Sequence, residues 1–261
     1  APLRADTVLR AGQRLEIRMD NGETETKAEI KAALDGLSPS FIRYIDEDML
    51  VVSKGAPLAT LPCGHIHTGT LREQLAVLLG QDAAAFDYHP VNRLDKGTSG
   101  LLCVARHAHA QRLLTRQLHT DSFIREYLAV TEGVPAQREG VIDAPIDRVA
   151  PDSFTRAVLP GGQRAVTRYR VEAALRDISL VRLFPVTGRT HQLRVHMAHI
   201  GHPLLGDTRY FTAESANLAA QYHAPYHQLC AVKLSLIHPI MGKTLEIACT
   251  PDFSVDILFH L

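Results

Sequence analysis

One carboxylate lies between two cations in a stretch whose residue types could perform chemistry. In HPVNRLDKGTSGLLCVAR, residues 89–106, Asp95 follows Arg93 and precedes Lys96, and an apolar run comes next. If this segment is extended, Arg93 and Asp95 lie on one side and Leu94 anchors the other. Nearby cations favour the ionised form of a carboxylate, and an ionised Asp in a shaped pocket can act as a nucleophile or a base. Taken alone, however, the stretch favours a structural turn, because Asp and Gly are common turn residues.

A second stretch contains a candidate partner for this carboxylate. In PVTGRTHQLRVHMAHIGHPLLGD, residues 185–207, the pattern predicts a helix over residues 191–200 with Thr190 as its N-cap. At 100° per residue, Arg194 lies on the flank of the apolar stripe rather than on the polar side, where Gln192, His196 and His199 are expected. A largely buried guanidinium needs a carboxylate partner, because an unpaired buried charge is very costly. We therefore expect Arg194 to pair with Asp95.

A third stretch, REYLAV over residues 125–130, combines an aromatic residue with a cation. Period-two alternation along a strand places Arg125 and Tyr127 on the same face. Such a pair is suited to stacking a planar base beside a phosphate. On its own, Tyr127 is better explained as an ordinary strand aromatic, so the functional interpretation depends on the other motifs.

Metal and disulfide chemistry have little support in the sequence. His196 and His199 are three residues apart, and no H-E-x-x-H pattern or nearby cysteine pair completes a ligand set, so we expect no metal site. The cysteines are far apart and form no C-x-x-C pair, so we interpret them as reduced thiols of a cytoplasmic protein. They are Cys63, Cys103, Cys230 and Cys249.

Hydrophobic periodicity predicts the elements that position these residues. Strands are expected in FIRYIDEDMLVVSKG, GLLCVA, FIREYLAVTEG, RAVTRYRVEAAL, ISLVRLFPV and QLCAVKLSLIHP. Helices are expected in TLREQLAVLLG and HAQRLLTRQLHT, in addition to the one that carries Arg194. Many strands and few helices at hairpin-compatible spacing predict an α+β fold with a mixed, mainly antiparallel central sheet and flanking helices.

Length, composition and charge limit the class of protein. The chain has 261 residues, of which 46% are hydrophobic and 21% charged, as in soluble globular proteins, and no apolar run is long enough to span a membrane. A net charge of +0 argues against binding nucleic acid by bulk charge alone. Arginines nevertheless dominate residues 164–194 and could form a local basic surface. Residues 1–40 are polar and predict an appendage, residues 41–261 predict the main domain, and a monomer is the default expectation.

Taken together, the three stretches resemble the motifs of the RluA-type pseudouridine synthases. Residues 92–101, NRLDKGTSGL, are similar to the family's H-R-L-D-x-x-T-S-G-L motif, and Arg125-x-Tyr127 resembles its basic-x-Tyr motif. Residues 188–196, GRTHQLRVH, resemble its third motif almost residue for residue. The likeness runs from about Phe41 to the C-terminus, and three ordered motifs at family-like spacing make it specific. Within residues 1–40, VLRAGQRLEI resembles the closing part of an S4 RNA-binding domain.

The resemblance implies a pseudouridine synthase fold with a catalytic cleft, and an isomerase that converts specific uridines in RNA to pseudouridine. Asp95 would be the catalytic nucleophile, although it could instead abstract the 2′ proton to give a glycal. Tyr127 would stack on the flipped base, and Arg93 would enter the space left in the RNA. The residues expected to bind substrate RNA are Arg93, Arg125, Tyr127, Arg189 and Arg194. No cofactor is expected, because the isomerisation needs neither a redox step nor a group donor. No membrane partner is expected either, because no apolar run is long enough to span a membrane.

Two departures from the family pattern stand out. Asn92 occupies the position where His is usual, which puts any RNA contact by that side chain in doubt. Gly55 follows Lys54 where the family usually has Lys-Pro, a change that affects only a turn. Large-subunit ribosomal RNA is the expected substrate, with transfer RNA as the alternative.

Two other function classes compete with the synthase. A non-catalytic RNA-binding protein of the same fold would keep the basic surface and Tyr127 but would not need Asp95 paired with Arg194. A glycoside hydrolase normally needs two carboxylates at a defined separation. Asp207 is the other acid near these motifs, and we expect it to cap or pair structurally.

Overall fold

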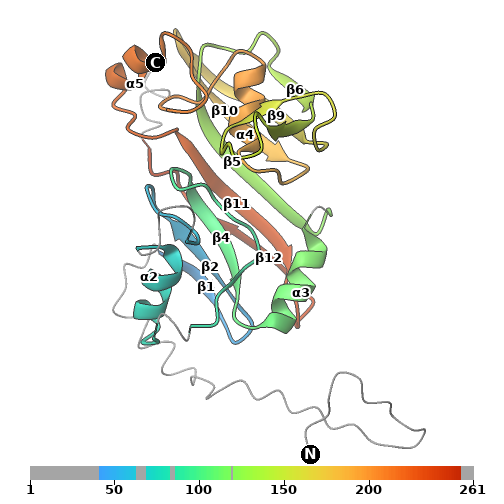
Figure 1. Cartoon of the computed structure of the whole chain (residues 1–261). Helices are drawn as coiled ribbons and strands as arrows, with labels where there is room; N and C mark the ends of the chain where they lie inside the picture. The colour runs from blue at the N-terminus through green and yellow to red at the C-terminus, as the bar shows by residue number, and fades with distance from the viewer. Residues whose placement is uncertain (1–40, 63–68, 83–85, 119, 254–261) are drawn as a thin grey trace, which may run out of the picture.

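The computed structural model describes residues 41–62, 69–82, 86–118 and 120–253, which fold into one large sheet, a separate hairpin and four short helices (Figure 1). The strands are β1 (Ile42–Ile45), β2 (Met49–Lys54), β3 (His89–Pro90), β4 (Ser99–Ala105), β5 (Phe123–Glu132), β6 (Glu139–Asp143), β7 (Ile146–Arg148), β8 (Arg156–Val158), β9 (Val166–Leu175), β10 (Ile178–Pro185), β11 (Leu229–Ile237) and β12 (Thr244–Ala248). The helices are α2 (Leu71–Leu78), α3 (Ala108–Gln117), α4 (Gln192–His199) and α5 (Ser215–Gln221). This content confirms the predicted α+β class. The predicted appendage over residues 1–40 lies outside the described residues.

The strand order of the large sheet is β1-β2-β4-β11-β5-β10-β9-β6, with β3 added on β4 and β12 on β11. The pairs in this sheet are antiparallel except for β4 with β11, which confirms a mixed, mainly antiparallel sheet. Figure 1 shows β5 and β11 as long strands that run from the part of the sheet with β1, β2 and β4 to the part with β9 and β10. The loop over residues 91–98, here called the Asp95 loop, leads into β4, and the end of β10 leads to α4. The pairing of these strands through β11 and β5 brings the Asp95 loop and α4 close together.

Strand β4 is the buried strand expected from its apolar run, and all seven of its residues are buried. Its pairing with β11 depends on Gly100, which has a φ of 100°. A Cβ at this position would collide with the backbone of Ala231 on β11. Glycine is therefore required both for the backbone conformation and for the close approach of the two strands.

Helices α2 and α3 have the amphipathic pattern that the sequence predicts. The buried side chains of α2 are Leu71, Leu75 and Ala76, and those of α3 are Ala110 and Leu114. Helix α3 begins after His107, whose Nδ1 accepts the backbone N–H of Ala110 at 3.1 Å. Among the described residues, no helix has both the length and the apolar character needed to cross a bilayer.

Helix α4 departs from the predicted pattern in two ways. Its N-cap is His191, in the left-handed conformation with a φ of 58°, rather than Thr190. Residues Gln192 and His196, expected on a polar side, are buried. Gln192 donates to the Val166 carbonyl oxygen and His196 hydrogen-bonds the Ala144 carbonyl oxygen, both at 2.9 Å, so this part of the polar side is covered by protein, whereas His199 is exposed. Hydrogen bonds to neighbouring backbone make this burial acceptable.

Candidate active site

Arg194 joins two carboxylates at the centre of the site. Its Nη1 donates to Oδ2 of Asp95 at 2.9 Å, which is the contact expected from the sequence. Its Nε and Nη2 donate to the two oxygens of Asp207 at 2.7 and 2.9 Å. The side chain of Asp207 is fully buried, whereas that of Asp95 is 28% exposed. Arg194 is therefore fixed from the buried side by Asp207 and presents one nitrogen to the more open Asp95.

The segment after α4 completes the support of Arg194. Oδ1 of Asp207 also accepts the backbone N–H groups of Arg209 and Tyr210, at 2.9 and 3.1 Å. The ring of Tyr210 lies under the guanidinium, with its centroid 5.0 Å from the Cζ of Arg194. The prediction that Asp207 pairs structurally is confirmed. The ion pair with Asp207, the cation–π contact with Tyr210 and the backbone hydrogen bonds that Asp207 accepts together hold Arg194 in one position.

The loop that carries Asp95 is anchored on its other side by buried groups. Leu94 is buried as predicted, and Thr60 bonds both its backbone groups: Oγ1 donates to the carbonyl oxygen at 2.9 Å and accepts the N–H at 3.3 Å. The backbone N–H of Leu58 donates to the carbonyl oxygen of Lys96 at 2.9 Å. These contacts leave the side chain of Asp95 as the polar group of this loop that faces Arg194.

Lys54, at the end of β2, is a further support of this loop. Its side chain is buried, and Nζ donates to the carbonyl oxygens of Leu58 at 2.8 Å and Lys96 at 3.4 Å. Burial lowers the pKa of Lys54 to about 8, although the negative charges of Asp95 and Asp252 oppose this shift. Lys54 therefore contributes positive charge near Asp95 without contacting it.

Asn92 has a structural function. It is buried, and its Oδ1 accepts the backbone N–H of Cys103 in β4 at 3.0 Å. This hydrogen bond fixes the start of the loop against the strand that follows it. The departure from the usual His thus affects a buried contact and leaves the Arg93-Leu94-Asp95 segment unchanged.

The charges of the site keep Asp95 ionised. Burial alone would raise the pKa of Asp95, but the charge that His191 carries when its ring is protonated, and the charge and hydrogen bond of Arg194, bring it below the usual value of an Asp. Burial likewise acts to lower the pKa of Arg194, and the hydrogen bonds and charges of Asp207 and Asp95 raise it. At neutral pH the site therefore contains a cation between two anions, one of which is partly open to solvent.

Tyr127 and Arg125 lie on β5, beside β11 and β10. Tyr127 is only 6% exposed and is part of the main hydrophobic core, so little of its ring is open to a ligand. Burial raises the pKa of Tyr127, and the negative charge of Asp95 adds to this effect, which places the two residues in one electrostatic environment. Nε of Arg125 is buried and has no hydrogen-bond partner among the described residues.

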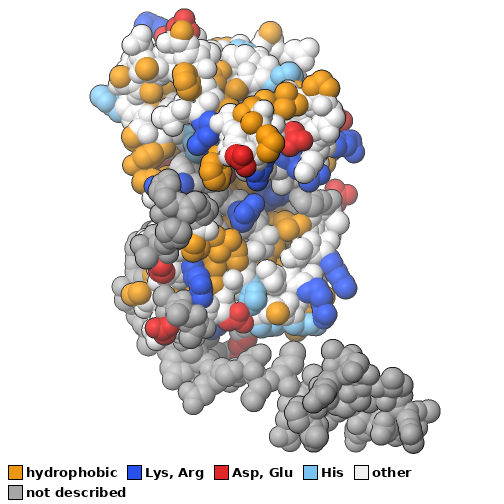
Figure 2. All heavy atoms as spheres, viewed as in Figure 1, with side chains coloured by type: hydrophobic (Ala, Val, Ile, Leu, Met, Phe, Trp, Pro, Cys, Tyr) orange, Lys and Arg blue, Asp and Glu red, His pale blue; other side chains and the backbone are white. Residues whose placement is uncertain are grey.

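The remaining predicted cations lie at the surface. Arg93 and Lys96 flank Asp95 with exposed side chains, and for Arg93 this agrees with the alternation around Leu94. Arg189 is also exposed, and its Nε donates to the backbone carbonyl oxygen of Arg164 at 3.0 Å, so it is not part of the Asp95–Arg194 contact. Figure 2 shows Lys and Arg side chains gathered near the middle of this face, in the hollow between its upper and lower parts. This arrangement is a local basic surface on a chain of zero net charge.

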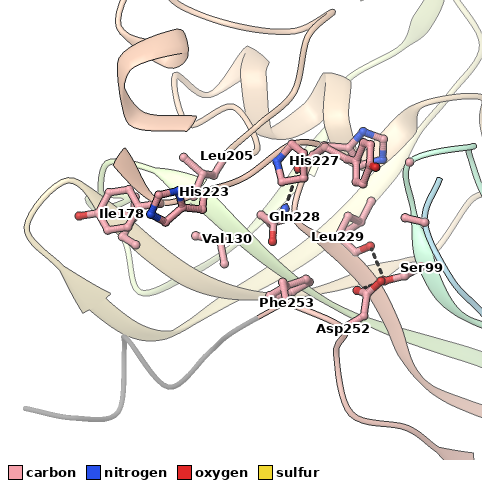
Figure 3. Close-up of a pocket in the computed structure, with 15 residues that line it drawn as sticks. Ser99, Val130, Ile178, Leu205, His223, His227, Gln228, Leu229, Asp252 and Phe253 are labelled. Atoms are coloured by element: carbon pink, nitrogen blue, oxygen red, sulfur yellow. Dashed lines mark hydrogen bonds between the residues drawn. The ribbon is translucent and has the colours of Figure 1, made fainter. Parts of the chain in front are cut away.

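A cavity of about 400 Å³ is lined in part by Gly97 and Ser99, which follow Asp95 in the chain. Figure 3 shows this cavity with Ser99, His227 and Asp252 on its wall. His227 lines it and contacts the Asp95 loop, with Nε2 2.8 Å from Oγ1 of Thr98. Ser99 donates to Oδ1 of Asp252 at 2.5 Å on the same wall. Burial lowers the pKa of His227 to about 4, and the positive charge of Arg194 adds to the shift. His227 is therefore a neutral support of the loop at physiological pH.

A second group of acids and a histidine resembles a metal site but has a different explanation. Asp46, Asp48 and His238 lie close enough to share an ion. Nδ1 of His238 accepts the backbone N–H groups of Ile240 and Met241, at 3.3 and 3.0 Å, so the ring proton is on Nε2. That proton is donated to Asp46 at 2.7 Å. Nε2 therefore has no lone pair to offer a cation. The three side chains instead connect the turn between β1 and β2 with the turn between β11 and β12.

Sequence reasoning did not assign His191, Tyr210 or His227 to the site. His191 lies within the third motif, but its contacts with Asp95 and Tyr210 were not indicated by spacing, and His227 carried no signal because it contacts Thr98, which is distant in the chain. Asp207 was considered, but as an alternative acid rather than as the main partner of Arg194. A signal for it existed: a guanidinium has five donor hydrogens, and a buried one is rarely satisfied by a single, partly exposed carboxylate.

Comparison with known proteins agrees with this geometry. Residues 48–199 match the family described as RNA pseudouridylate synthase. The chain is 37% identical to ribosomal large subunit pseudouridine synthase D of Haemophilus influenzae, an alignment that covers 95% of this chain and 76% of the relative. It is also 37% identical to the uncharacterized RNA pseudouridine synthase YjbO of Bacillus subtilis, over 80% of this chain and 71% of the relative.

Solved structures give the same result. Human RNA Pseudouridylate Synthase Domain Containing 1 superposes with a TM-score of 0.64 at 28% identity, over 81% of this chain and 83% of the human chain. The family match covers more than half of the sequence and includes Asp95, Tyr127 and Arg194. The chain belongs to the RNA pseudouridylate synthase family, in its RluA-type branch, and is an RNA pseudouridine synthase, an isomerase of uridine in RNA.

Proposed function

We propose that this enzyme isomerises specific uridines of large-subunit ribosomal RNA, and that Asp95 is the group that attacks the nucleotide. Several relatives of this chain are named ribosomal large subunit pseudouridine synthase D, which supports this choice of RNA. For Asp95, the supporting observation is the state of its two oxygens. Oδ2 is held by Arg194, whereas Oδ1 accepts no hydrogen bond from another described residue.

The reaction rearranges bonds within one nucleotide. The N1–C1′ bond breaks, the uracil turns, C5 bonds to C1′, and the proton of C5 leaves while N1 gains one. An ionised Asp95 could begin this sequence by attack of Oδ1 on C1′, or by removal of the 2′ proton to give a glycal. Both routes need a carboxylate that stays deprotonated next to the ribose. Arg194 provides that condition, because its charge holds the pKa of Asp95 low despite burial.

The nucleotide must leave its stack before Asp95 can reach C1′. Extruding a base costs a few kcal/mol, and stacking on an aromatic side chain returns roughly 1–3 kcal/mol. Tyr127 is the aromatic residue that we assign to this contact, through the small part of its ring that is not covered by the core. Exposed Arg93 would fill the gap left in the RNA, and Arg125 and Arg189 would bind phosphates.

Tritium release from RNA labelled at C5 of uridine tests both parts of this proposal. We expect release from large-subunit ribosomal RNA transcripts, and little from small-subunit ribosomal RNA or transfer RNA. Asp95→Asn should abolish release while filter binding of the same RNA persists. Asp121→Asn, at an exposed position, is the matched control and should release tritium like the wild type. Full turnover by Asp95→Asn would refute the assigned role, and release from transfer RNA alone would refute the assigned RNA.

A further inference from the structure

His191 is aimed at the reacting carboxylate by an unusual backbone conformation. It is the N-cap of α4 and has φ 58° and ψ 16°, in the left-handed region, which is uncommon for residues other than glycine and in which Asn, Asp and His are the most frequent exceptions. Its side chain is 16% exposed and its Nε2 lies 3.9 Å from Oδ2 of Asp95. Backbone strain of this kind persists where the surrounding structure holds it in place, often at functional sites. Here it places an imidazole beside Asp95, next to Arg194.

The hydroxyl of Tyr210 determines which nitrogen of His191 carries the proton. Oη of Tyr210 accepts the backbone N–H of Arg156 at 3.0 Å and lies 2.7 Å from Nδ1 of His191. Among the described residues, Nδ1 is the one acceptor within reach of the hydroxyl proton. This arrangement favours donation from Tyr210 to Nδ1, with the proton of the neutral ring on Nε2. That N–H faces Asp95.

The surroundings keep this imidazole neutral. Burial lowers the pKa of His191, and the charges of Arg194 and Arg209 lower it further, while Asp95 and Asp207 act in the opposite direction. A neutral ring whose Nδ1 is occupied cannot take a proton at Nε2, so His191 is not suited to act as a base there. It can donate a hydrogen bond from Nε2.

We propose that His191 is a positioning residue for the isomerisation, and that its Nε2–H closes on Oδ2 of Asp95 when RNA fills the site. Two donors, Nη1 of Arg194 and Nε2 of His191, would then bind the same oxygen and stop rotation of the carboxylate. Oδ1 would be left pointing at the ribose. The present separation of 3.9 Å is longer than a hydrogen bond, and such contacts commonly tighten only when substrate binds. The inference rests on the proposed role of Asp95.

Three variants test this chain of contacts. His191→Asn keeps a residue that tolerates the left-handed conformation but is too short to reach both Tyr210 and Asp95. Tyr210→Phe removes the hydroxyl and keeps the ring beneath Arg194. We expect each to lower kcat about 10- to 100-fold, with KM within about threefold of the wild type. Because both act through one imidazole, the double variant should lose no more than His191→Asn alone.

The control is His223→Asn, at an exposed histidine whose φ of 51° matches that of His191. It should retain wild-type kcat, which separates the effect of the side chain from that of the left-handed backbone. If kcat of His191→Asn is unchanged while Asp95→Asn is inactive, the inference is wrong but the role of Asp95 stands. If Asp95→Asn is active, the proposed role of Asp95 is itself wrong, whatever the result for His191→Asn. A rise in KM at constant kcat, or additive losses in the double variant, would also overturn the proposal.

Discussion

The carboxylate of Asp207 binds Arg194 through both oxygens, at 2.7 and 2.9 Å, whereas Asp95 binds the same guanidinium through one oxygen at 2.9 Å. A two-point pairing of guanidinium and carboxylate is the stronger and more directional arrangement. Arg194 therefore has a fixed position that does not depend on Asp95. Asp95 can change its contacts during a reaction without leaving a buried charge unpaired.

Replacing Asp207 with Asn should destabilise the enzyme more than removal of any surface ion pair. The variant leaves the buried Arg194 with the single Asp95 contact, and breaking one side of a buried pair costs about 3–5 kcal/mol. Urea denaturation with the unfolding midpoint as readout measures this loss. The control is Asp143→Asn, whose partner Arg164 is 3.4 Å away with both side chains largely exposed, and its change should stay below about 1 kcal/mol. Equal effects of the two variants would show that Asp207 is not the anchor of Arg194.

Arg194→Lys should lower kcat strongly although the charge is conserved. A lysine ammonium cannot bridge Asp95 and both oxygens of Asp207, so one carboxylate loses its partner. We expect a loss on the order of 100-fold in tritium release, comparable to removing a preorganised donor from an active site. Arg182→Lys is the control, because Arg182 also bridges two acids, Glu172 at 2.7 Å and Glu126 at 3.2 Å, but at the surface of the sheet. A wild-type rate for Arg194→Lys would show that the branched guanidinium, which bridges Asp95 and Asp207, is not required.

Tyr127→Phe should change RNA affinity by no more than about twofold, because the ring is retained and only the hydroxyl is lost. Tyr127→Leu should weaken binding, since stacking of a base on an aromatic ring is worth about 1–3 kcal/mol. Filter binding in the Asp95→Asn background measures both without turnover of the RNA. A large loss of affinity in Tyr127→Phe would mean that the hydroxyl, rather than the ring, contacts the substrate.

The stability of the enzyme should fall between pH 6.5 and pH 4 because of His227. Burial lowers its pKa from 6.5 to about 4 in the folded state, so the unfolded state binds more protons in this window. The stability present above pH 6.5 is therefore lost as the pH falls, by about 3 kcal/mol for this group. His227→Gln should flatten the dependence of the urea midpoint on pH in this range. His199→Gln, at an exposed position on α4, should leave the dependence as in the wild type.

Local pattern was sufficient to predict most elements of this fold. The apolar run of β4, the amphipathic spacing of α2 and α3 and the alternation around Leu94 all correspond to the observed burial. Helix α4 was predicted in the right place but with the wrong N-cap. Its polar side was misjudged because periodicity assumes one solvent-facing side. Thr167 and Ala144 cover that side of the helix by hydrogen-bonding His196.

The sequence by itself determined the family, the order of the three motifs and the expected contact of Arg194 with Asp95. These follow from residue types and short spacings, which are local properties of the chain. The tertiary structure decided that Asp207 is the main partner of Arg194, that Asn92 is buried, and that Nε2 of His191 faces Asp95. Each of these depends on which side chains meet when β4, β11, β5 and β10 pair in one sheet. This pairing allows Asp95 and Arg194, 99 positions apart in the chain, to share a hydrogen bond. Such contacts are set by packing and by competition among donors and acceptors.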